Sequence, residues 1–265
     1  TEFHQDPVVA SNKKVVVTIA FTHPEDRDSF ERRVRLRMFD KITDKTEKEL
    51  TTPKHSIVYD QLKLNAYVHS EQLEVPPKAG RLQLTIESGV RAARAGNATS
   101  APLTTSVDVP GLNSLRIASV ALDLVRDERN EPNQVLLIQS SFSVPEAEMP
   151  PKVRAWLLPL QHPDPQQQRT YGSRPFVWSA ATLRPEVLVD ANRIELAQIP
   201  GEREHYELHS FRYSADPGRQ LYVKIDAGLK SFGGYVLGDA VERIITVPQY
   251  PRELSILSQG ALLSL

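Results

Sequence analysis

The chain contains no cysteine at any of its 265 positions. This absence excludes disulfide bonds, catalysis by a thiolate and zinc sites with cysteine ligands. It fits the cytosol, and equally a bacterial envelope protein that avoids misoxidation. The sequence also has no apolar run near the ~18 residues that a membrane-spanning helix needs. Its 32 basic and 33 acidic residues nearly cancel, at a formal net charge of -1, so we expect no nucleic-acid partner.

Glycine is scarce, with 12 residues, whereas proline is frequent, with 20. Proline fits poorly inside helices and central strands but well at strand edges and in linkers. Short strands joined by proline-containing connections are typical of β-sandwiches. The length exceeds the roughly 100–200 residues of one domain, so the composition predicts two all-β domains.

A pattern near the start of the chain recurs in its second half. Residues 15–24 read VVVTIAFTHP and residues 135–145 read VLLIQSSFSVP, so each is an aliphatic run that leads to phenylalanine and proline. The next segment alternates in both copies, as RVRLRM over 33–38 and KVRAWL over 152–157. Period-two alternation of this kind predicts half-buried strands.

The ends of the two copies also match. LQLTIESGVR over 82–91 corresponds to LYVKIDAGLK over 221–230, and Gly-Arg precedes each block. A closing strand that runs into proline follows, as SVDVP over 106–110 and IITVP over 244–248. The same blocks in the same order indicate two related domains.

We therefore predict an all-β chain of two tandem antiparallel β-sandwich domains plus the first strand of a third. The predicted units are an N-terminal tail over 1–9, the first sandwich over 10–111, the second over 112–250, and the start of a following domain over 251–265. Pro110 and Gly111 are the expected hinge. Because the last segment has several large aliphatic residues and no partner strand, we expect the chain to be part of a longer protein.

Helical signals are few. Asp26 or Asp28 suits the N-cap of a short turn before the alternating strand. Residues 182–188 (TLRPEVL) predict a second short helix with proline in its first turn. Residues 43–52 and 161–169 have the composition of loops.

The run from His205 to His209 (HYELH) contains the residue types of a zinc-protease motif, but not its order. That motif needs two histidines four positions apart on a helix, with glutamate beside the first. Here the neighbouring residues alternate as in a strand, which separates the histidines by roughly 13 Å at ~3.3 Å per residue. One zinc ion cannot reach both at ~2 Å. We therefore expect polar residues on an outer strand face, and no metal or other cofactor.

Two glycine-containing loops, 89–96 and 228–234, lack the sequence of a phosphate-binding loop. Their equivalent places predict a structural turn that both sandwiches share. Trp156 and Trp178 would make a sugar-stacking platform if both were exposed, but tryptophan more often anchors a core, and we expect burial. No constellation of catalytic residues is recognisable, so no enzyme is predicted. A hydrolase with an atypical site would require carboxylates that converge in a cleft.

Arg33, Arg35 and Arg37 are expected on one strand face, about 6–7 Å apart. Such a row could bind an acidic protein surface or the phosphates of lipopolysaccharide. It could also be a solvated face whose charges prevent edge-to-edge aggregation. Both interpretations remain open.

Seven short blocks occur in a definite order in the second half of the chain. They are PEVL at 185–188, IPGE at 199–202, HSFRY at 209–213, PGR at 217–219, GLKSFGGY at 228–235, VPQYP at 247–251 and LSILSQGALL at 254–263. In this order they resemble the N-terminal region of bacterial alpha-2-macroglobulins. The resemblance is clearest over 180–265 and reaches 10–110 through the internal repeat.

The resemblance implies macroglobulin-like sandwiches, of an Ig- or fibronectin-like kind, in a large periplasmic protein. Members of this family are exported, and some are anchored to the inner membrane as lipoproteins. They trap proteases that cleave a bait region, and some form a thioester between a cysteine and a glutamine. This chain has no cysteine and no recognisable bait segment.

A non-catalytic scaffold role is therefore what the resemblance implies for this chain. The implied partners are later domains of the same chain and, through the full-length protein, target proteases. No small-molecule substrate is expected. The alternative is an Ig-like adhesion or envelope-binding module that contacts an anionic polymer or a partner protein of the envelope.

Overall fold

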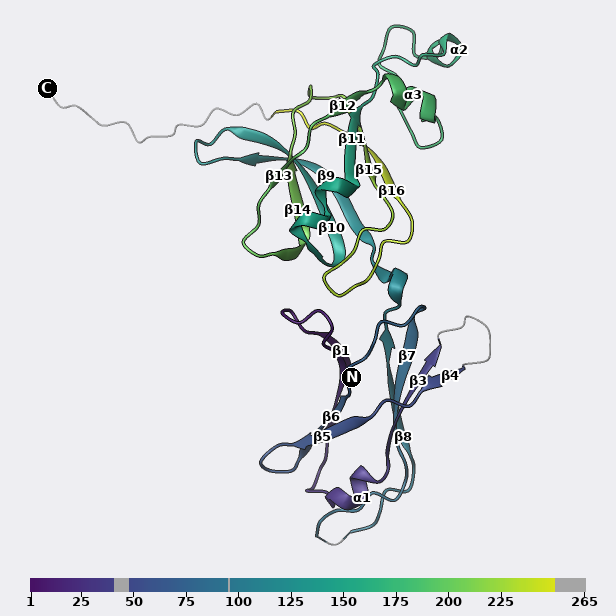
Figure 1. Cartoon of the computed structure of the whole chain (residues 1–265), viewed down its shortest axis with the longest axis vertical. Helices are drawn as coiled ribbons and strands as arrows, with labels where there is room; N and C mark the ends of the chain where they lie inside the picture. The colour runs from purple at the N-terminus through teal and green to yellow at the C-terminus, as the bar shows by residue number, and fades with distance from the viewer. Residues whose placement is uncertain (41–47, 95, 251–265) are drawn as a thin grey trace, which may run out of the picture.

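The computed structural model describes residues 1–40, 48–94 and 96–250 (Figure 1). These residues fold into four four-stranded sheets, arranged as two β-sandwiches that follow one another along the long axis of the molecule. All pairings between the strands are antiparallel. The predicted all-β class with tandem antiparallel sandwiches is confirmed. The predicted first strand of a third unit, in 251–265, lies outside the described residues.

The first sandwich contains eight strands in two sheets, ordered β1-β2-β6-β5 and β4-β3-β7-β8. Its strands are β1 (Glu2–Gln5), β2 (Lys13–Ala20), β3 (Val34–Asp40), β4 (Glu49–Thr51), β5 (His55–Tyr59), β6 (Asn65–Ser70), β7 (Gly80–Ile86) and β8 (Leu103–Val109). The sequence predicts a tail over 1–9, but β1 pairs with β2 at the edge of the first sheet. These residues therefore belong to the sandwich.

Alternating burial explains why the strands of this sandwich pack face to face. In β7 every second residue is buried, and β3 and the first residues of β2 follow the same rule. One short helix, α1 (Arg27–Glu31), adds Phe30 to the core, edge-on to Phe21 at 5.1 Å between ring centroids. Asp26 is the N-cap, since its side chain accepts a hydrogen bond from Ser29 N, which confirms one of the two predicted caps.

The second sandwich has a larger core and several short helices. Its strands are β9 (Ile117–Arg126), β10 (Pro132–Pro145), β11 (Val153–Leu157), β12 (Asn192–Ile194), β13 (Ala197–Ile199), β14 (His205–Arg212), β15 (Gln220–Ile225) and β16 (Val241–Thr246). The short helices are η1 (Leu112–Ser114), η2 (Glu146–Glu148), η3 (Pro150–Lys152), α2 (Pro165–Gln168) and α3 (Pro185–Asp190). The sheets are ordered β13-β14-β10-β9 and β12-β11-β15-β16.

Both sandwiches use one strand order. The sheet positions of β1 to β8 in the first sandwich are those of β9 to β16 in the second. Thus β3 matches β11 and β7 matches β15. After β7 and β15 the chain turns through Gly89 and Gly228, whose φ angles of 97° and 78° favour glycine. The two glycine loops therefore begin as structural turns, as predicted. The exact domain boundaries stay a prediction.

The junction between the sandwiches is held by backbone hydrogen bonds to both of them. Leu112 N donates to Pro76 O at 2.8 Å, and Leu112 O accepts from Val236 N at 2.7 Å. The loop after β1 also reaches the second sandwich, since a Cβ on Gly233 would lie 2.7 Å from Gln5 Oε1. The expected hinge at residues 110 and 111 is therefore tied on both sides.

Two loop predictions need correction, while one helix prediction holds. Residues 43–52 were expected to be a loop, but Glu49–Thr51 forms β4, because it pairs with β3. Residues 161–169 include the one-turn helix α2, capped by Asp164. The predicted helix with proline in its first turn is α3. In the described part of the chain, none of the helices is long and apolar enough to cross a membrane.

Candidate functional site: a groove beneath an insertion

The second sandwich carries a long connection at a place where the first has a short one. Between β11 and β12 the chain runs for 34 residues, 158–191, whereas eight residues, 41–48, connect β3 and β4. This long connection, here called the insertion, contains α2 and α3 and lies at the end of the molecule farthest from the first sandwich (Figure 1). The fold forms with a short connection at that place, so the insertion is an addition to it.

Local capping explains how the insertion turns. Asp164 accepts a hydrogen bond from Gln166 N at 2.9 Å, and Pro165 occupies the first helical position of α2. The side chain of Gln168 then closes the loop, because it accepts from His162 N at 2.7 Å and donates to the carbonyl oxygen of Gly172 at 2.8 Å. These contacts make the first half of the insertion a compact loop.

The insertion has a small core of its own on the outer face of the sheet. The buried members of this core are Leu158, Phe176, Trp178, Val187 and Tyr222. Trp178 is also fixed by hydrogen bonds, since its Nε1–H donates to Pro159 O at 2.8 Å and its backbone N donates to Gln220 Oε1 at 2.7 Å. Gln220 belongs to β15, so Trp178 anchors the insertion to the sheet.

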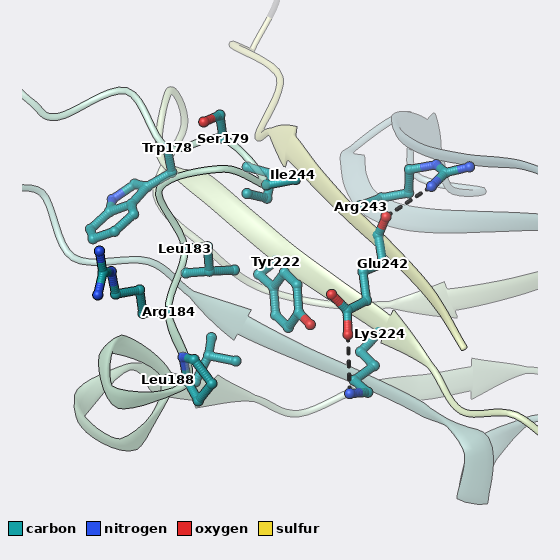
Figure 2. Close-up of a pocket in the computed structure, with 12 residues that line it drawn as sticks. Trp178, Ser179, Leu183, Arg184, Leu188, Tyr222, Lys224, Glu242, Arg243 and Ile244 are labelled. Atoms are coloured by element: carbon teal, nitrogen blue, oxygen red, sulfur yellow. Dashed lines mark hydrogen bonds and ion pairs between the residues drawn. The ribbon is translucent and has the colours of Figure 1, made fainter. Parts of the chain in front are cut away.

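A groove remains between the insertion and the sheet, with a cavity volume of about 500 Å³. Tyr222 and Ile244, from β15 and β16, form its floor, and Trp178, Leu183 and Leu188 line its other side (Figure 2). Pockets of ~300–1,000 Å³ with apolar walls and a few polar groups are the usual size and kind of ligand sites. We take this groove as the candidate functional site.

The polar part of the groove is an ion pair on the sheet surface. Lys224 Nζ and Glu242 Oε1 lie 3.1 Å apart, on neighbouring strands (Figure 2). Burial of the Tyr222 phenol, together with the adjacent Glu242 carboxylate, raises the pKa of Tyr222 above its usual value. The hydroxyl is therefore protonated throughout the physiological pH range and serves as a hydrogen-bond donor.

The groove offers an ion pair, the Tyr222 hydroxyl and apolar walls as contacts for a ligand. Its lining contains one carboxylate, Glu242, and no histidine among the residues that form it. The hydroxyl oxygen of Ser179 lies 3.2 Å from the hydroxyl oxygen of Thr182. Elsewhere, the described residues contain no cluster of three or more histidine, aspartate or glutamate side chains that could hold a metal ion.

Three curated proteins align with almost the whole chain. They are an alpha-2-macroglobulin homolog of Yersinia pestis, 32% identical over 264 residues, and the alpha-2-macroglobulins of Pasteurella multocida (strain Pm70) and Rickettsia conorii (strain ATCC VR-613 / Malish 7), 26% identical over 263 and 24% over 279 residues. These alignments cover 100%, 99% and 98% of this chain. The chain is a homologue of bacterial alpha-2-macroglobulins.

The homologue spans only about 13% of the length of the curated relatives that it matches. No protein-family model matches it. Among solved structures it is similar to native alpha-2-macroglobulin from Escherichia coli, in a crystal structure spanning domains MG0-NIE-MG1. That match has 14% identity and a TM-score of 0.30, and it covers 93% of this chain and 69% of the other.

The three arginines of the predicted interaction face have different environments in this alpha-2-macroglobulin homologue. Arg33 precedes β3 and donates to the carbonyl oxygens of Ser29 and Ser88, at 2.7 and 3.0 Å. Arg35 lies 3.6 Å from a carboxylate oxygen of Glu87. Arg37 is exposed on the outer face of β3. Arg33 is therefore used within the fold, and whether the face binds a partner stays a prediction.

The two histidines of β14 also differ from each other. The strand prediction is confirmed by β14, but His209 is fully buried, which corrects the expectation of polar residues on an outer face. Its Nε2 lies 3.0 Å from Tyr206 O, and burial lowers the pKa of its imidazole. His205 instead stacks on Phe232 at 3.9 Å between ring centroids. His209 belongs to the core because β14 places every second side chain inward at its C-terminal end.

The two tryptophans lie in the same cluster of the homologue. Trp178 is 3% exposed, as predicted, whereas Trp156 on β11 is half-buried against that cluster. Sequence reasoning treated both as core anchors and did not identify the groove beside them. The greater length of the second repeat was the available signal, because it required an insertion somewhere between matching strands.

Proposed function

We propose that the chain is a non-catalytic scaffold segment of a longer, periplasmic inhibitor that traps proteases. One observation carries this proposal: alpha-2-macroglobulins of three bacteria align with the chain along its whole length and are several times longer. A segment that makes up about 13% of such relatives fits one part of a multidomain protein. Its partners would be the later domains of the same protein and, through them, the target protease.

The junction supports a scaffold role. Leu112 hydrogen-bonds to both sandwiches through its backbone, and Gly233 of the second sandwich packs against Gln5 of the first. A segment held in this way moves as one block, which suits a protein that rearranges around a captured protease. The chain also contains no cysteine, so any thioester chemistry would belong to another part of the longer protein.

The test compares the longer protein and this chain side by side. Each is mixed with elastase, and residual protease activity is measured on a large protein substrate and on a small chromogenic peptide. We expect the longer protein to suppress cleavage of the large substrate only, and this chain to suppress neither. The proposal fails if the longer protein is digested without shielding large substrates. Cell fractionation tests the periplasmic location.

A further inference from the structure

The residues that line the groove beneath the insertion carry more positive than negative charge. Arg184, Lys224 and Arg243 line it, against Glu242 as the single acidic residue of the lining. Lys224 is paired with Glu242 at 3.1 Å. Arg243 is exposed and donates to the backbone carbonyl of Glu242 at 2.8 Å, and a neutral acceptor leaves its charge uncompensated. Arg184 is exposed as well.

The two arginines lie on opposite sides of an apolar floor. In Figure 2, Arg184 is on the side of Trp178 and Leu188, and Arg243 is beyond Ile244. Leu188 and Ile244 are only partly buried against the cluster of the insertion, so they have apolar surface left to cover. The site therefore offers an apolar centre between two cationic ends.

We infer that this groove binds a peptide segment of a partner protein in which a large apolar side chain is flanked by acidic residues. The apolar side chain would cover the surface of Leu188 and Ile244, which removes apolar area from water. The acidic residues would pair with the two arginines, whose planar guanidinium groups favour carboxylates. Charge complementarity selects this partner over a neutral or basic peptide.

The surface around the groove fits a protein partner. The insertion lies on the side of the second sandwich away from the junction (Figure 1). It also displays exposed apolar side chains close in sequence to the lining residues, namely Val177 at 61% and Val189 at 83% exposure. Exposed apolar groups beside a groove mark surfaces that proteins use for contact. This inference does not depend on protease trapping and is tested separately.

The test uses the whole chain labelled with ¹⁵N and three capped heptapeptides, Ac-GSDFEGS-NH₂, Ac-GSKFKGS-NH₂ and Ac-GSDAEGS-NH₂. Binding is followed by the indole N–H resonance of Trp178, which lines the groove, and by backbone resonances. We expect saturable shifts around Trp178 with the first peptide, and binding weaker by about tenfold with the other two. Raising the salt concentration from about 50 to 500 mM should lower the affinity for the first peptide severalfold.

Charge-reversal variants locate the binding site. Arg184→Glu and Arg243→Glu change exposed side chains. Each substitution should lower the affinity for the acidic peptide by about tenfold. Arg129→Glu, on the exposed turn between β9 and β10, is the matched control and should bind normally. Equal binding of the basic peptide, unchanged binding by both groove variants, or shifts confined to another surface would overturn the inference. A longer protein that no longer binds the peptide would show that its own segment fills the groove, which would overturn a partner in trans.

Discussion

The α-carbon of Gly111 lies so close to the backbone of Lys78 that a Cβ on Gly111 would be 2.3 Å from the Lys78 carbonyl carbon. The φ and ψ angles of Gly111, −88° and 175°, are open to any residue. Glycine is therefore needed here for space and not for backbone conformation. The chain leaving the first sandwich passes directly over the segment before β7, and this contact helps to fix the second sandwich.

Gly111→Ala should disturb the junction. The added methyl group meets backbone atoms that cannot turn away, and overpacking of this kind costs about 1–3 kcal/mol. We expect a lower unfolding midpoint in thermal denaturation and a larger radius of gyration in small-angle X-ray scattering. Gly238→Ala is the control, because its nearest neighbour would be Asn113 Cβ at an ordinary 3.6 Å. Equal behaviour of the two variants would contradict a tight junction.

Burial of His209 predicts lower stability in acid. Its pKa in the folded state lies below the unfolded value, so the unfolded chain binds more protons once the pH falls below about 6.5. Stability should therefore decrease from about pH 6.5 down to the folded pKa, with a slope of at most about 1.4 kcal/mol per pH unit for this one group, and then level off. Urea denaturation at several pH values measures this slope.

His209→Gln isolates that contribution from the other six histidines. The variant should be less stable at pH 8, because glutamine does not fill the buried site of the imidazole. Its stability should also depend less on pH between about 5 and 7. His4→Gln, at an exposed position, should keep the slope of the parent chain. An unchanged slope in His209→Gln would show that the imidazole is not held neutral by burial.

Trp178→Ala should release the insertion while the sandwich stays folded. Trp178 supplies the largest side chain of the insertion core and donates the hydrogen bond to Pro159 O. Removing a buried tryptophan costs about 3–5 kcal/mol, and the loss falls on a cluster with only five buried residues among those described. Brief trypsin treatment followed by mass spectrometry should then show cleavage after Arg169, whereas Arg174 is protected by the proline that follows it. Val177→Ala, its exposed neighbour, should remain resistant.

Arg33 and Arg37 should differ in how much each contributes to stability. Arg33→Ala removes hydrogen bonds to Ser29 and Ser88 and should cost about 1 kcal/mol. Arg37→Ala should change stability by less than about 0.5 kcal/mol, as for other exposed sites. Thermal unfolding distinguishes these outcomes.

Binding to vesicles that contain lipopolysaccharide tests the envelope alternative for the same residues. Salt-sensitive binding that is lost on triple substitution of Arg33, Arg35 and Arg37 by alanine would favour that alternative. The scaffold proposal instead predicts equal, weak binding by the parent and the triple variant.

The repeated blocks predicted the fold because each of them is local. The alternation in 33–38 and 152–157 marks β3 and β11, and the glycines after β7 and β15 mark the turns. Local patterns of this kind can be recognised in a single sequence, because they reflect the spacing of apolar residues along a strand and the backbone conformation of a turn. The strand order within each sheet was not predicted, because pairing joins strands that are far apart in the sequence.

The groove could not be predicted in the same way. Its floor and sides come from Trp178, Leu188, Tyr222 and Ile244, which are distant in the sequence and each of which resembles an ordinary core residue. Gln220 gave no signal either, although its side chain ties Trp178 to β15. Such a site depends on how a long connection folds back over a sheet, and no periodic pattern records that. His209 was misplaced because alternation alone does not say which face of a strand is inward, and β14 turns His209 to the core side.

The most direct test of the scaffold role maps where a protease first cuts the longer protein. The longer protein is treated briefly with elastase, the fragments are identified by mass spectrometry, and activity on a large substrate is followed in parallel. We predict that the first cut falls outside the part homologous to residues 1–250. It should coincide with the loss of elastase activity on the large substrate. A first cut within that part that itself triggers the loss would contradict the account.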